Sequence, residues 1–303
     1  MISAKKIPAF FLLMLGLLCG FAKNVWADDF RILLVLSDNA PLYQRFAKAF
    51  EQDVPKGMRV DIVRQAQDFD SQKTDLIVSV GVRAAYRVAE KSSQPLLAAM
   101  IPGKAYAGLR EVKQGEATAI YVDQPWRRQV EMLNAVMPKR KRIGVLYTDA
   151  QDIAGLRSEL ARRQDTLVAR HLGGRDTLSS DLEEVLTESD VLLALPEGEI
   201  YNANSIRNIL LSSYRHGIPL VGFSEAYVRA GALCAIFSTP EQLALQTANA
   251  AASYAQTGKL PEAQYPQQYS IAVNRSVAGT FGMVIGSDEA IFLQIKKSSG
   301  DTR

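Results

Sequence analysis

The chain has 303 residues, with 35 Lys and Arg against 32 Asp and Glu, and is long enough for two domains of ordinary size. Three of the lysines and no acidic residue fall in the first 27 positions, so the remainder is balanced at 32 basic and 32 acidic residues. A mature chain without net charge lacks the excess of Lys and Arg that is typical of nucleic-acid-binding proteins, so we expect no nucleic-acid partner.

The N-terminus has the pattern of a secretory signal peptide. Two lysines precede the apolar run Phe10–Leu18, which is too short to span a bilayer. Val25–Ala27 then supplies small residues at the −3 and −1 positions of a cleavage site. We therefore predict that Met1–Ala27 is removed and that the mature protein is periplasmic, without insertion in the membrane. An uncleaved anchor is the alternative.

Cysteine usage bears on the same question. Cys19 is preceded by Leu18, where a lipobox has a small residue, so ordinary cleavage is preferred to a lipoprotein anchor at Cys19. Cys234 is then the only cysteine of the mature chain, which rules out an internal disulfide. It lies in the apolar run Ala232–Phe237 and is expected to be a small buried side chain.

The first half of the mature chain alternates strands and helices. Apolar runs bounded by turn residues predict the strands Arg31–Ser37, Arg59–Val63, Asp75–Val80, Leu96–Ile101 and Ala117–Val122. Helical spacing of apolar residues predicts helices over Pro41–Glu51 and Val82–Lys91. This rhythm is typical of an α/β fold in which helices cover a parallel sheet.

A second series of the same kind follows. The predicted helices are Trp126–Met137, Ile153–Arg163, Leu178–Thr187 and Ser205–Tyr214, and the strands are Arg142–Tyr147, Thr166–Leu172, Val191–Leu195 and Ile218–Phe223. A helix over Thr239–Gln256, a strand over Tyr269–Val273 and a short helix over Arg275–Phe281 complete it. The polar segment 286–303 is expected to be a frayed terminus. The basic cluster Lys139–Arg142 is expected to be a solvated loop.

Four segments resemble the uncharacterised ABC-transporter substrate-binding proteins, the group that includes the TrpX-like receptors. They read SVGVRAAYRVAEKSSQPLLAAMI, MPKRKRIGVLYTDAQ, IPLVGFSEAYVRAGALCAIFSTPEQLALQTANAAASYAQTGKLP and YSIAVNRSVAGTFGMVI, in the family's order. The RIGVLY and RAGAL blocks are the most specific. The resemblance covers most of the mature chain.

This resemblance implies a type I periplasmic-binding-protein fold, in which a three-crossover hinge joins two Rossmann-like lobes with parallel sheets. By this analogy the first lobe comprises residues 28–123 and 231–266, and the second comprises 124–230 and 267–286. Residues 287–303 are then a flexible C-terminal tail. A small ligand is expected in the cleft between the lobes, which close on it by hinge motion.

Candidate ligand contacts follow from the rule that α/β sheets bind ligands at the carboxyl ends of their strands. They are Ser37, Asn39, Gly81, Arg83, Met100, Asp123, Tyr147, Asp149, Glu197, Ser224 and Glu225. The helix start after Gly81 offers N–H groups to a carboxylate, and Arg83 offers a bidentate contact. Glu197 and Glu225 suit an ammonium, so together the groups suit a zwitterion such as an amino acid. Solvated side chains remain the alternative for these charged residues.

Several pocket positions depart from the family pattern. The turn that reads GTPA in the family is GVRA after Val80, and Ile101-Pro102 replaces an Asp-Pro. The acidic-then-threonine loop after Leu195 becomes Pro196-Glu197-Gly198-Glu199. The fold inference is independent of these changes, but no named ligand carries over.

An enzyme is not expected. The segment 222–226, GFSEA, resembles a nucleophile elbow but has Ala226 where the motif needs glycine. A hydrolase of that class needs a histidine later in the chain than its serine, whereas both histidines, His171 and His216, precede Ser224. The sequence also offers no metal-ligand spacing and no nucleotide-binding motif, so we expect neither a metal nor a cofactor.

The sequence therefore predicts the substrate-binding protein of an ABC importer. Its partners are a small polar or zwitterionic ligand and a permease in the inner membrane, and the protein is expected to be a monomer. Because several pocket positions differ from the family pattern, a second hypothesis stays open. In it the protein is a periplasmic sensor or interaction module that retains the fold without a transport ligand.

Overall fold

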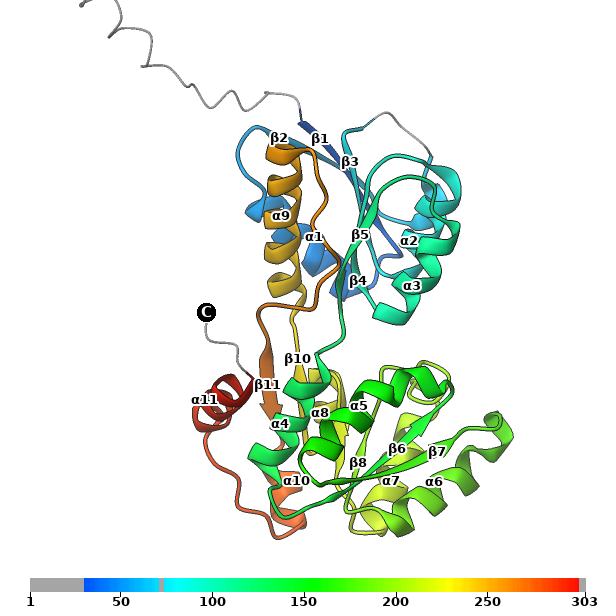
Figure 1. The fold of residues 1–303 in the computed structure, drawn as a ribbon, viewed down its shortest axis with the longest axis vertical. Helices are drawn as coiled ribbons and strands as arrows, with labels where there is room; N and C mark the ends of the chain where they lie inside the picture. The colour runs from blue at the N-terminus through cyan, green and yellow to red at the C-terminus, as the bar shows by residue number, and fades with distance from the viewer. Residues whose placement is uncertain (1–29, 71–73, 300–303) are drawn as a thin grey trace, which may run out of the picture.

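The computed structural model describes residues 30–70 and 74–299. Two α/β lobes, each built on its own sheet, are joined by three crossing segments of chain (Figure 1). This architecture confirms the predicted fold class. The predicted signal peptide, Met1–Ala27, lies outside the described residues.

The first lobe contains a five-stranded parallel sheet with the order β2-β1-β3-β4-β5. Its strands are β1 (Phe30–Leu36), β2 (Met58–Val63), β3 (Leu76–Val80), β4 (Leu96–Ile101) and β5 (Ala117–Tyr121). Its helices are α1 (Pro41–Asp53), α2 (Val82–Lys91), α3 (Gly103–Val112) and α9 (Pro240–Thr257), with a 3-10 turn, η1 (Ala66–Asp68).

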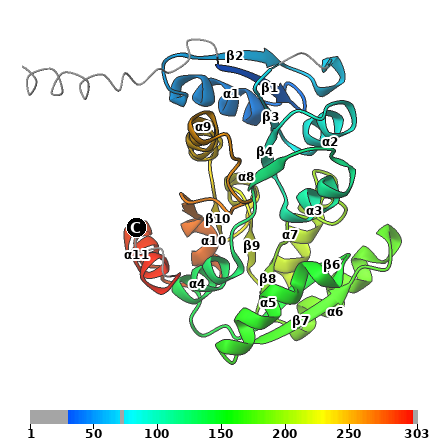
Figure 2. The same cartoon turned by 45° about the horizontal axis from the view of Figure 1, so that its top comes forward.

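Helices cover both faces of this sheet, which explains why its central strands are almost entirely apolar, with Ser79 of β3 as a buried polar exception. Ile32 and Leu34 of β1 pack in one cluster with α1 and α9. Leu33 and Val35 of the same strand face the opposite cluster, which contains α2 and α3. Figure 2 shows α1 and α9 on one side of the sheet and α2 and α3 on the other.

The second lobe contains a six-stranded sheet with the order β11-β10-β9-β8-β6-β7. Its strands are β6 (Arg142–Tyr147), β7 (Thr166–His171), β8 (Val191–Leu193), β9 (Leu220–Gly222), β10 (Cys234–Phe237) and β11 (Ser270–Val273). Only the β10–β11 pair of this sheet is antiparallel.

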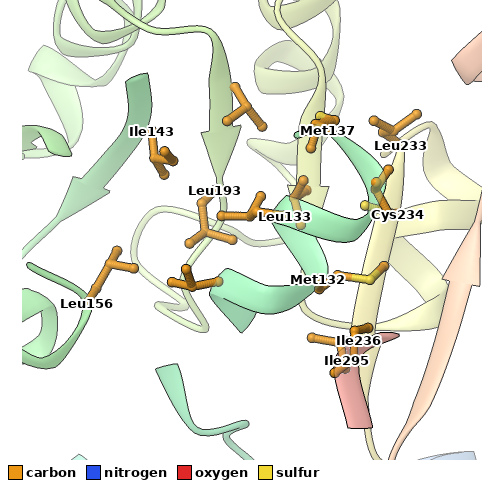
Figure 3. Close-up of a cluster of buried hydrophobic side chains, with 14 of the residues drawn as sticks. Met132, Leu133, Met137, Ile143, Leu156, Leu193, Leu233, Cys234, Ile236 and Ile295 are labelled. Atoms are coloured by element: carbon orange, nitrogen blue, oxygen red, sulfur yellow. The ribbon is translucent and has the colours of Figure 1, made fainter. Parts of the chain in front are cut away.

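The helices of this lobe also lie on both faces of the sheet. They are α4 (Trp126–Val136), α5 (Ala150–Arg162), α6 (Leu178–Glu188), α7 (Ile206–Arg215), α8 (Glu225–Ala230), α10 (Arg275–Thr280) and α11 (Asp288–Ser299), with a 3-10 turn, η2 (Arg175–Thr177). One core cluster joins α4, α5 and α11 to the sheet, with Leu133 and Leu193 at its centre (Figure 3). The other lies under α6 and α7.

Two expected boundaries are wrong. The expectation assigned residues 231–266 to the first lobe, yet β10 pairs with β9 and β11 in the second sheet. The later part of this range does belong to the first lobe, since α9, Leu260 and Ala263 pack in its core. The expected flexible tail, 287–303, contains helix α11. Its Ile291 and Ile295 are buried, with exposed fractions of 3% and 0%. Both isoleucines belong to the core cluster that contains Leu133 and Val136 of α4, so this helix packs on the second lobe.

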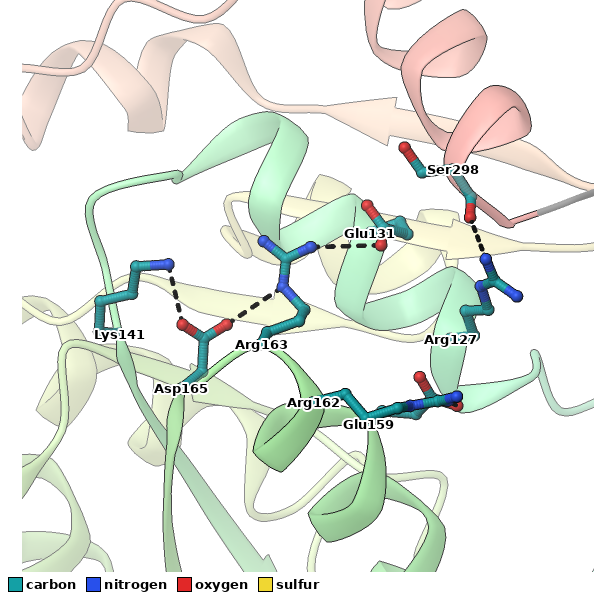
Figure 4. Close-up of polar contacts among 8 residues, drawn as sticks. All are labelled: Arg127, Glu131, Lys141, Glu159, Arg162, Arg163, Asp165 and Ser298. Atoms are coloured by element: carbon teal, nitrogen blue, oxygen red, sulfur yellow. Dashed lines mark hydrogen bonds and ion pairs between the residues drawn. The ribbon is translucent and has the colours of Figure 1, made fainter.

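Lys139, Lys141 and Arg142 of the basic cluster are exposed, as expected for a solvated loop, but the cluster also forms ion pairs. Arg142 forms two hydrogen bonds with one oxygen of Asp190, at 2.9 and 3.1 Å, and Arg140 donates to the Asp190 carbonyl at 2.6 Å. Lys141 pairs with Asp165 at 2.9 Å, and Asp165 also contacts Arg163 (Figure 4). The cluster therefore fixes the starts of three neighbouring strands, β6, β7 and β8.

Candidate ligand-binding site

A cavity of about 590 Å³ lies between the lobes and is lined by both of them and by the crossing segments. Pockets of a few hundred to a thousand Å³ are typical of small-molecule sites. The residues that line it are Leu42, Arg45, Met100, Pro102, Gly103, Lys104, Val122, Asp123, Gln124, Trp126, Gln129, Leu195, Pro196, Glu197, Phe223, Ser224, Glu225, Ala226, Arg229, Ile236, Phe237, Ser238, Thr239, Pro240 and Tyr265.

The first-lobe wall is shaped by an irregularity at the end of β4. The register with β5 shifts between Ala99 and Ile101, and Met100 between them has a φ of +55°, which is uncommon for a residue with a side chain. The chain then turns into α3. The Asp123 carboxylate, from the loop after β5, accepts a hydrogen bond from the Gly103 N–H at 2.6 Å. An acidic group at a helix N-terminus is electrostatically favourable.

The second-lobe wall is held together by Glu197. Its carboxylate accepts hydrogen bonds from the Thr148 N–H at 2.9 Å and from the Thr148 hydroxyl at 2.6 Å. These bonds tie the loop after β8 to the loop after β6. Glu225, the first residue of α8, pairs with Arg229 one turn later at 2.8 Å.

Aromatic side chains form much of the apolar lining. The Phe223 ring lies 4.4 Å from the Tyr227 ring, and Tyr265 meets Tyr121 edge-on at 5.3 Å. Trp126, at the start of α4, packs against α5 at Gly155, where an added Cβ would come within 2.4 Å of the indole. The glycine is thus required for the tryptophan to lie where it does.

Burial raises the pKa values of two tyrosine hydroxyls near this wall, those of Tyr265 and Tyr121. It raises the pKa of Tyr265, and the nearby Asp123 carboxylate raises it further. The pKa of Tyr121 is raised first by burial and then by Tyr106, Tyr265 and Asp123. Like ordinary tyrosines, both hydroxyls are neutral at physiological pH, and the raised pKa keeps them neutral at more alkaline pH as well.

The three crossing segments are joined by a buried polar network. The Gln124 amide donates to the Ser238 hydroxyl at 2.8 Å, and that hydroxyl donates to the Gln268 carbonyl at 2.6 Å. Arg128 donates to Gln124 Oε1 at 2.7 Å and to the Pro266 carbonyl at 3.0 Å. Each crossing therefore contributes at least one partner to the same network, at the base of the cavity.

Five of the predicted site residues line the cavity: Met100, Asp123, Glu197, Ser224 and Glu225. The other six are not among the lining residues: Ser37, Asn39, Gly81, Arg83, Tyr147 and Asp149. Whether a predicted residue lines the cavity depends on the strand that it follows. The ends of β4, β8 and β9 face the cavity. The ends of β1, β3 and β6 are engaged in other contacts.

The predicted carboxylate site at the start of α2 is occupied by the chain itself. The Ser37 hydroxyl accepts the Ala84 N–H at 3.1 Å and donates to the Val80 carbonyl at 2.8 Å. The Gly81 N–H donates to the Ala99 carbonyl at 2.9 Å. Arg83 pairs with Asp38. Ser37 therefore acts as a cap, and Arg83 has a carboxylate partner within its own lobe.

The remaining predicted residues make contacts outside the cavity lining. Asn39 is exposed and accepts a hydrogen bond from the Gln44 amide at 3.0 Å. Tyr147 packs edge-on against the His171 ring at 5.5 Å. Asp149 pairs with Lys104 at 3.3 Å, and this ion pair joins the second lobe to the first.

The sequence of the chain matches one protein family over residues 49–287, the family described as ABC transporter substrate binding protein. The match spans well over half of the chain. The protein belongs to this family. None of the curated proteins compared matches the chain significantly.

Solved structures show the same fold as this substrate-binding protein. A substrate-binding protein with adhesive properties from Clostridium difficile, in its ligand-free open form, has a TM-score of 0.68 at 18% identity, covering 86% of this chain and 97% of that one. A Streptococcus pneumonia ABC domain in complex with L-Trp has a TM-score of 0.64 at 17% identity, covering 87% and 98%. A conserved domain protein from Vibrio cholerae has a TM-score of 0.64 at 19% identity, covering 87% and 97%.

Sequence reasoning missed part of the site of this family member. It did not identify Trp126, Tyr265, Lys104 or Arg45 as cavity residues. The rule that ligands bind at the carboxyl ends of strands (the strand-end rule) considers only the loops that follow those strands. Aromatic residues at the two ends of crossing segments, such as Trp126 and Tyr265, were the available signal. Within the described residues, no group of three or more His, Cys, Asp or Glu is arranged to hold a metal ion.

Proposed function

We propose that this protein is the periplasmic substrate-binding component of an ABC importer and holds one small metabolite between its lobes. The cavity is the observation that carries the proposal, because residues of both lobes and of the crossings line it together. A ligand that contacts both lobes binds the closed arrangement better than the open one and so favours closure.

Export by a cleaved signal peptide at Met1–Ala27 is part of the proposal. No helix among residues 30–70 and 74–299 has the length and apolarity to cross a bilayer. The inner-membrane permease is the proposed partner of the closed protein, which acts as a monomer.

The ligand class proposed from the sequence is a small polar or zwitterionic metabolite, with an amino acid as one example. The cavity supports the ammonium half of such a ligand, because Asp123, Glu197 and Glu225 lie in its walls. Apolar and aromatic side chains such as Trp126 and Phe223 would hold the rest of the molecule.

Filling the cavity tests the proposed site. Ala226 lines the cavity on α8, whereas Ala230 lies on the same helix, is exposed and is not a lining residue. In isothermal titration of ligand-stripped protein against amino acids, amines and related metabolites, we expect at least one to bind the wild type and the Ala230→Trp variant. The Ala226→Trp variant should bind it at least tenfold more weakly. Absence of binding by every candidate, or unchanged binding by Ala226→Trp, would overturn the proposal.

A further inference from the structure

Two ion pairs, one on each lobe, lie beside the interlobe cavity. In the first lobe, Arg45 of α1 forms two hydrogen bonds with Glu241 of α9, at 2.8 and 2.9 Å. In the second lobe, Glu225 of α8 pairs with Arg229 one helical turn later at 2.8 Å. Arg45, Glu225 and Arg229 all line the cavity. Each lobe therefore brings one ion pair to the same cavity.

The pairing of Arg45 leaves part of its guanidinium unused. Glu241 accepts hydrogen bonds from Nε and from Nη2, one on each carboxylate oxygen. A guanidinium has five N–H donors in one rigid plane, so a bidentate partner at Nε and Nη2 also orients Nη1. Among residues 30–70 and 74–299, Nη1 of Arg45 has no hydrogen-bond partner. Glu241 thus holds Arg45 in place and leaves a charged donor available.

Glu225 has a matching unused acceptor. Arg229 contacts its Oε2 atom, and within the described part of the chain Oε1 accepts no hydrogen bond from another residue. The pKa of Arg45 is raised, first by its hydrogen bonds with Glu241 and then by the charges of Glu241 and Glu225. Arg45 of the first lobe and Glu225 of the second therefore lie within electrostatic range of each other across the cavity.

We propose that Arg45 is a positioning residue for lobe closure, which binds Glu225 across the cleft when the lobes close and keeps its bonds with Glu241. Glu241, Arg45, Glu225 and Arg229 then form a row of alternating charges, which we call the clasp. The side chains of Arg45 and Glu225 are 56% and 55% exposed, so their contact has the strength of an exposed ion pair and favours closure without locking it. The inference goes beyond the proposed function, because it concerns closure and not the ligand.

Uncharged substitutions test the clasp in the mature protein without any added ligand. Spin labels at the exposed positions Glu90 in the first lobe and Arg207 in the second report interlobe distances. Arg45→Gln and Glu225→Gln should each lower the ratio of short to long distances about two- to fivefold, the size of one exposed ion pair. The double variant should lower this ratio no further than one single variant, because either substitution already removes the contact.

Lys48→Gln is the matched control for Arg45→Gln. Lys48 is an exposed base on the same helix and is not a lining residue, so its substitution should leave the distances unchanged. Wild-type distances in both single variants would overturn the inference. So would a double variant whose loss equals the product of the two single losses, or a Lys48→Gln variant that acts as strongly as Arg45→Gln.

Urea denaturation of the same variants separates the clasp from a role within one lobe. Arg45 and Glu241 both belong to the first lobe, so a merely structural pair would change the free energy of unfolding and leave the interlobe distances as they are. That combination would also overturn the inference. We expect changed distances and a urea midpoint close to that of the wild type, because exposed ion pairs contribute little to folding.

The clasp and the proposed function can fail separately, because the distances are measured without a ligand. Unchanged distances in the variants, together with binding in the titration, refute the clasp and leave the binding function intact. The expected changes in distance, without binding by any candidate ligand, support the clasp and refute the proposed function.

Discussion

Gly81 occupies a backbone position that side chains rarely adopt. Its φ is +85° and its ψ is 166°, at the junction of β3 and α2. An added Cβ would lie 2.6 Å from both the Ser37 and the Tyr43 hydroxyl oxygens. The residue is therefore required by local conformation and by packing, and its proposed role as an anion donor is not needed to explain it.

We predict that Gly81→Ala lowers the free energy of unfolding by about 2–3 kcal/mol, because the alanine is strained and must displace two neighbours. Urea denaturation followed by circular dichroism measures the loss. Gly198→Ala is the control, since an added Cβ there meets nothing within 4 Å, and its effect should be within about 0.5 kcal/mol. A stable Gly81→Ala protein would show that this turn can relax.

Cys234 is buried in the core of the second lobe, and burial raises the pKa of its thiol to about 12. The thiol is therefore protonated in the folded protein at pH 8 and becomes reactive on unfolding. Because the folded pKa is raised, its contribution to stability is complete below the unfolded pKa and is lost as the pH rises toward about 12.

We predict slow labelling of the folded mature protein by a thiol reagent at pH 8 and fast labelling in guanidinium. The label count should be one per chain, because the proposed cleavage after Ala27 removes Cys19. Two labels on the exported protein would contradict cleavage after Ala27, and fast labelling of the folded protein would contradict the burial of Cys234.

At the scale of elements, Arg128 connects the crossings. Its side chain is 4% exposed and lies over the Tyr269 ring, with its guanidinium carbon 4.3 Å from the ring centroid. It also donates to Gln124 and to the Pro266 carbonyl. Removal of the guanidinium leaves buried acceptors without this donor, which is costly.

We predict that Arg128→Met destabilises the protein by about 2–3 kcal/mol in urea denaturation. Arg157→Met, at an exposed position on α5, should stay within about 0.5 kcal/mol of the wild type. An Arg128→Met protein as stable as the control would mean that the network of the crossings contributes little to folding.

The Lys104–Asp149 pair connects the lobes outside the crossings. Both side chains are partly exposed, 54% and 42%, so we expect a coupling of at most about 1 kcal/mol. Spin labels at Glu90 and Arg207 report the distance between the lobes. Lys104→Asp should shift or broaden that distance distribution, and the double variant with Asp149→Lys should restore it.

A matched pair within one lobe is the control for this cycle. Arg59 and Asp61, 3.4 Å apart on β2, form an exposed pair that spans no interface. Reversing their charges should leave the interlobe distances unchanged. If charge reversal left the interlobe distances unchanged for both pairs, Lys104 and Asp149 would not restrain the lobes.

Local patterns predicted the elements with continuous apolar runs or clear helical spacing. Helix α3 was missed because Gly103 and Gly108 lower its helical propensity. Gly108 has a packing reason, since an added Cβ there would lie 2.6 Å from the Tyr86 hydroxyl oxygen. Helix α11 was missed because two buried isoleucines are a weak signal in a polar segment. The apolar run at β10 indicated burial but not which sheet it joins.

At the scale of the whole molecule, the two-lobed fold was predictable from the resemblance and from the repeated β-α rhythm. The cleft was predictable only in part. The strand-end rule located Asp123 and Glu197 but also included Arg83, whose partner Asp38 lies on another loop of the same lobe. The arrangement of the lobes decides which loops meet, and that arrangement depends on contacts between crossings far apart in the sequence.

The central claim is that the interlobe cavity holds one small molecule. Native mass spectrometry of the mature protein, purified without unfolding and incubated with a small-molecule extract of cells, tests it most directly. We predict one small adduct per chain on the wild type and on Ala230→Trp, and none on Ala226→Trp. An adduct that Ala226→Trp retains, or no adduct on any of the three proteins, would contradict the claim.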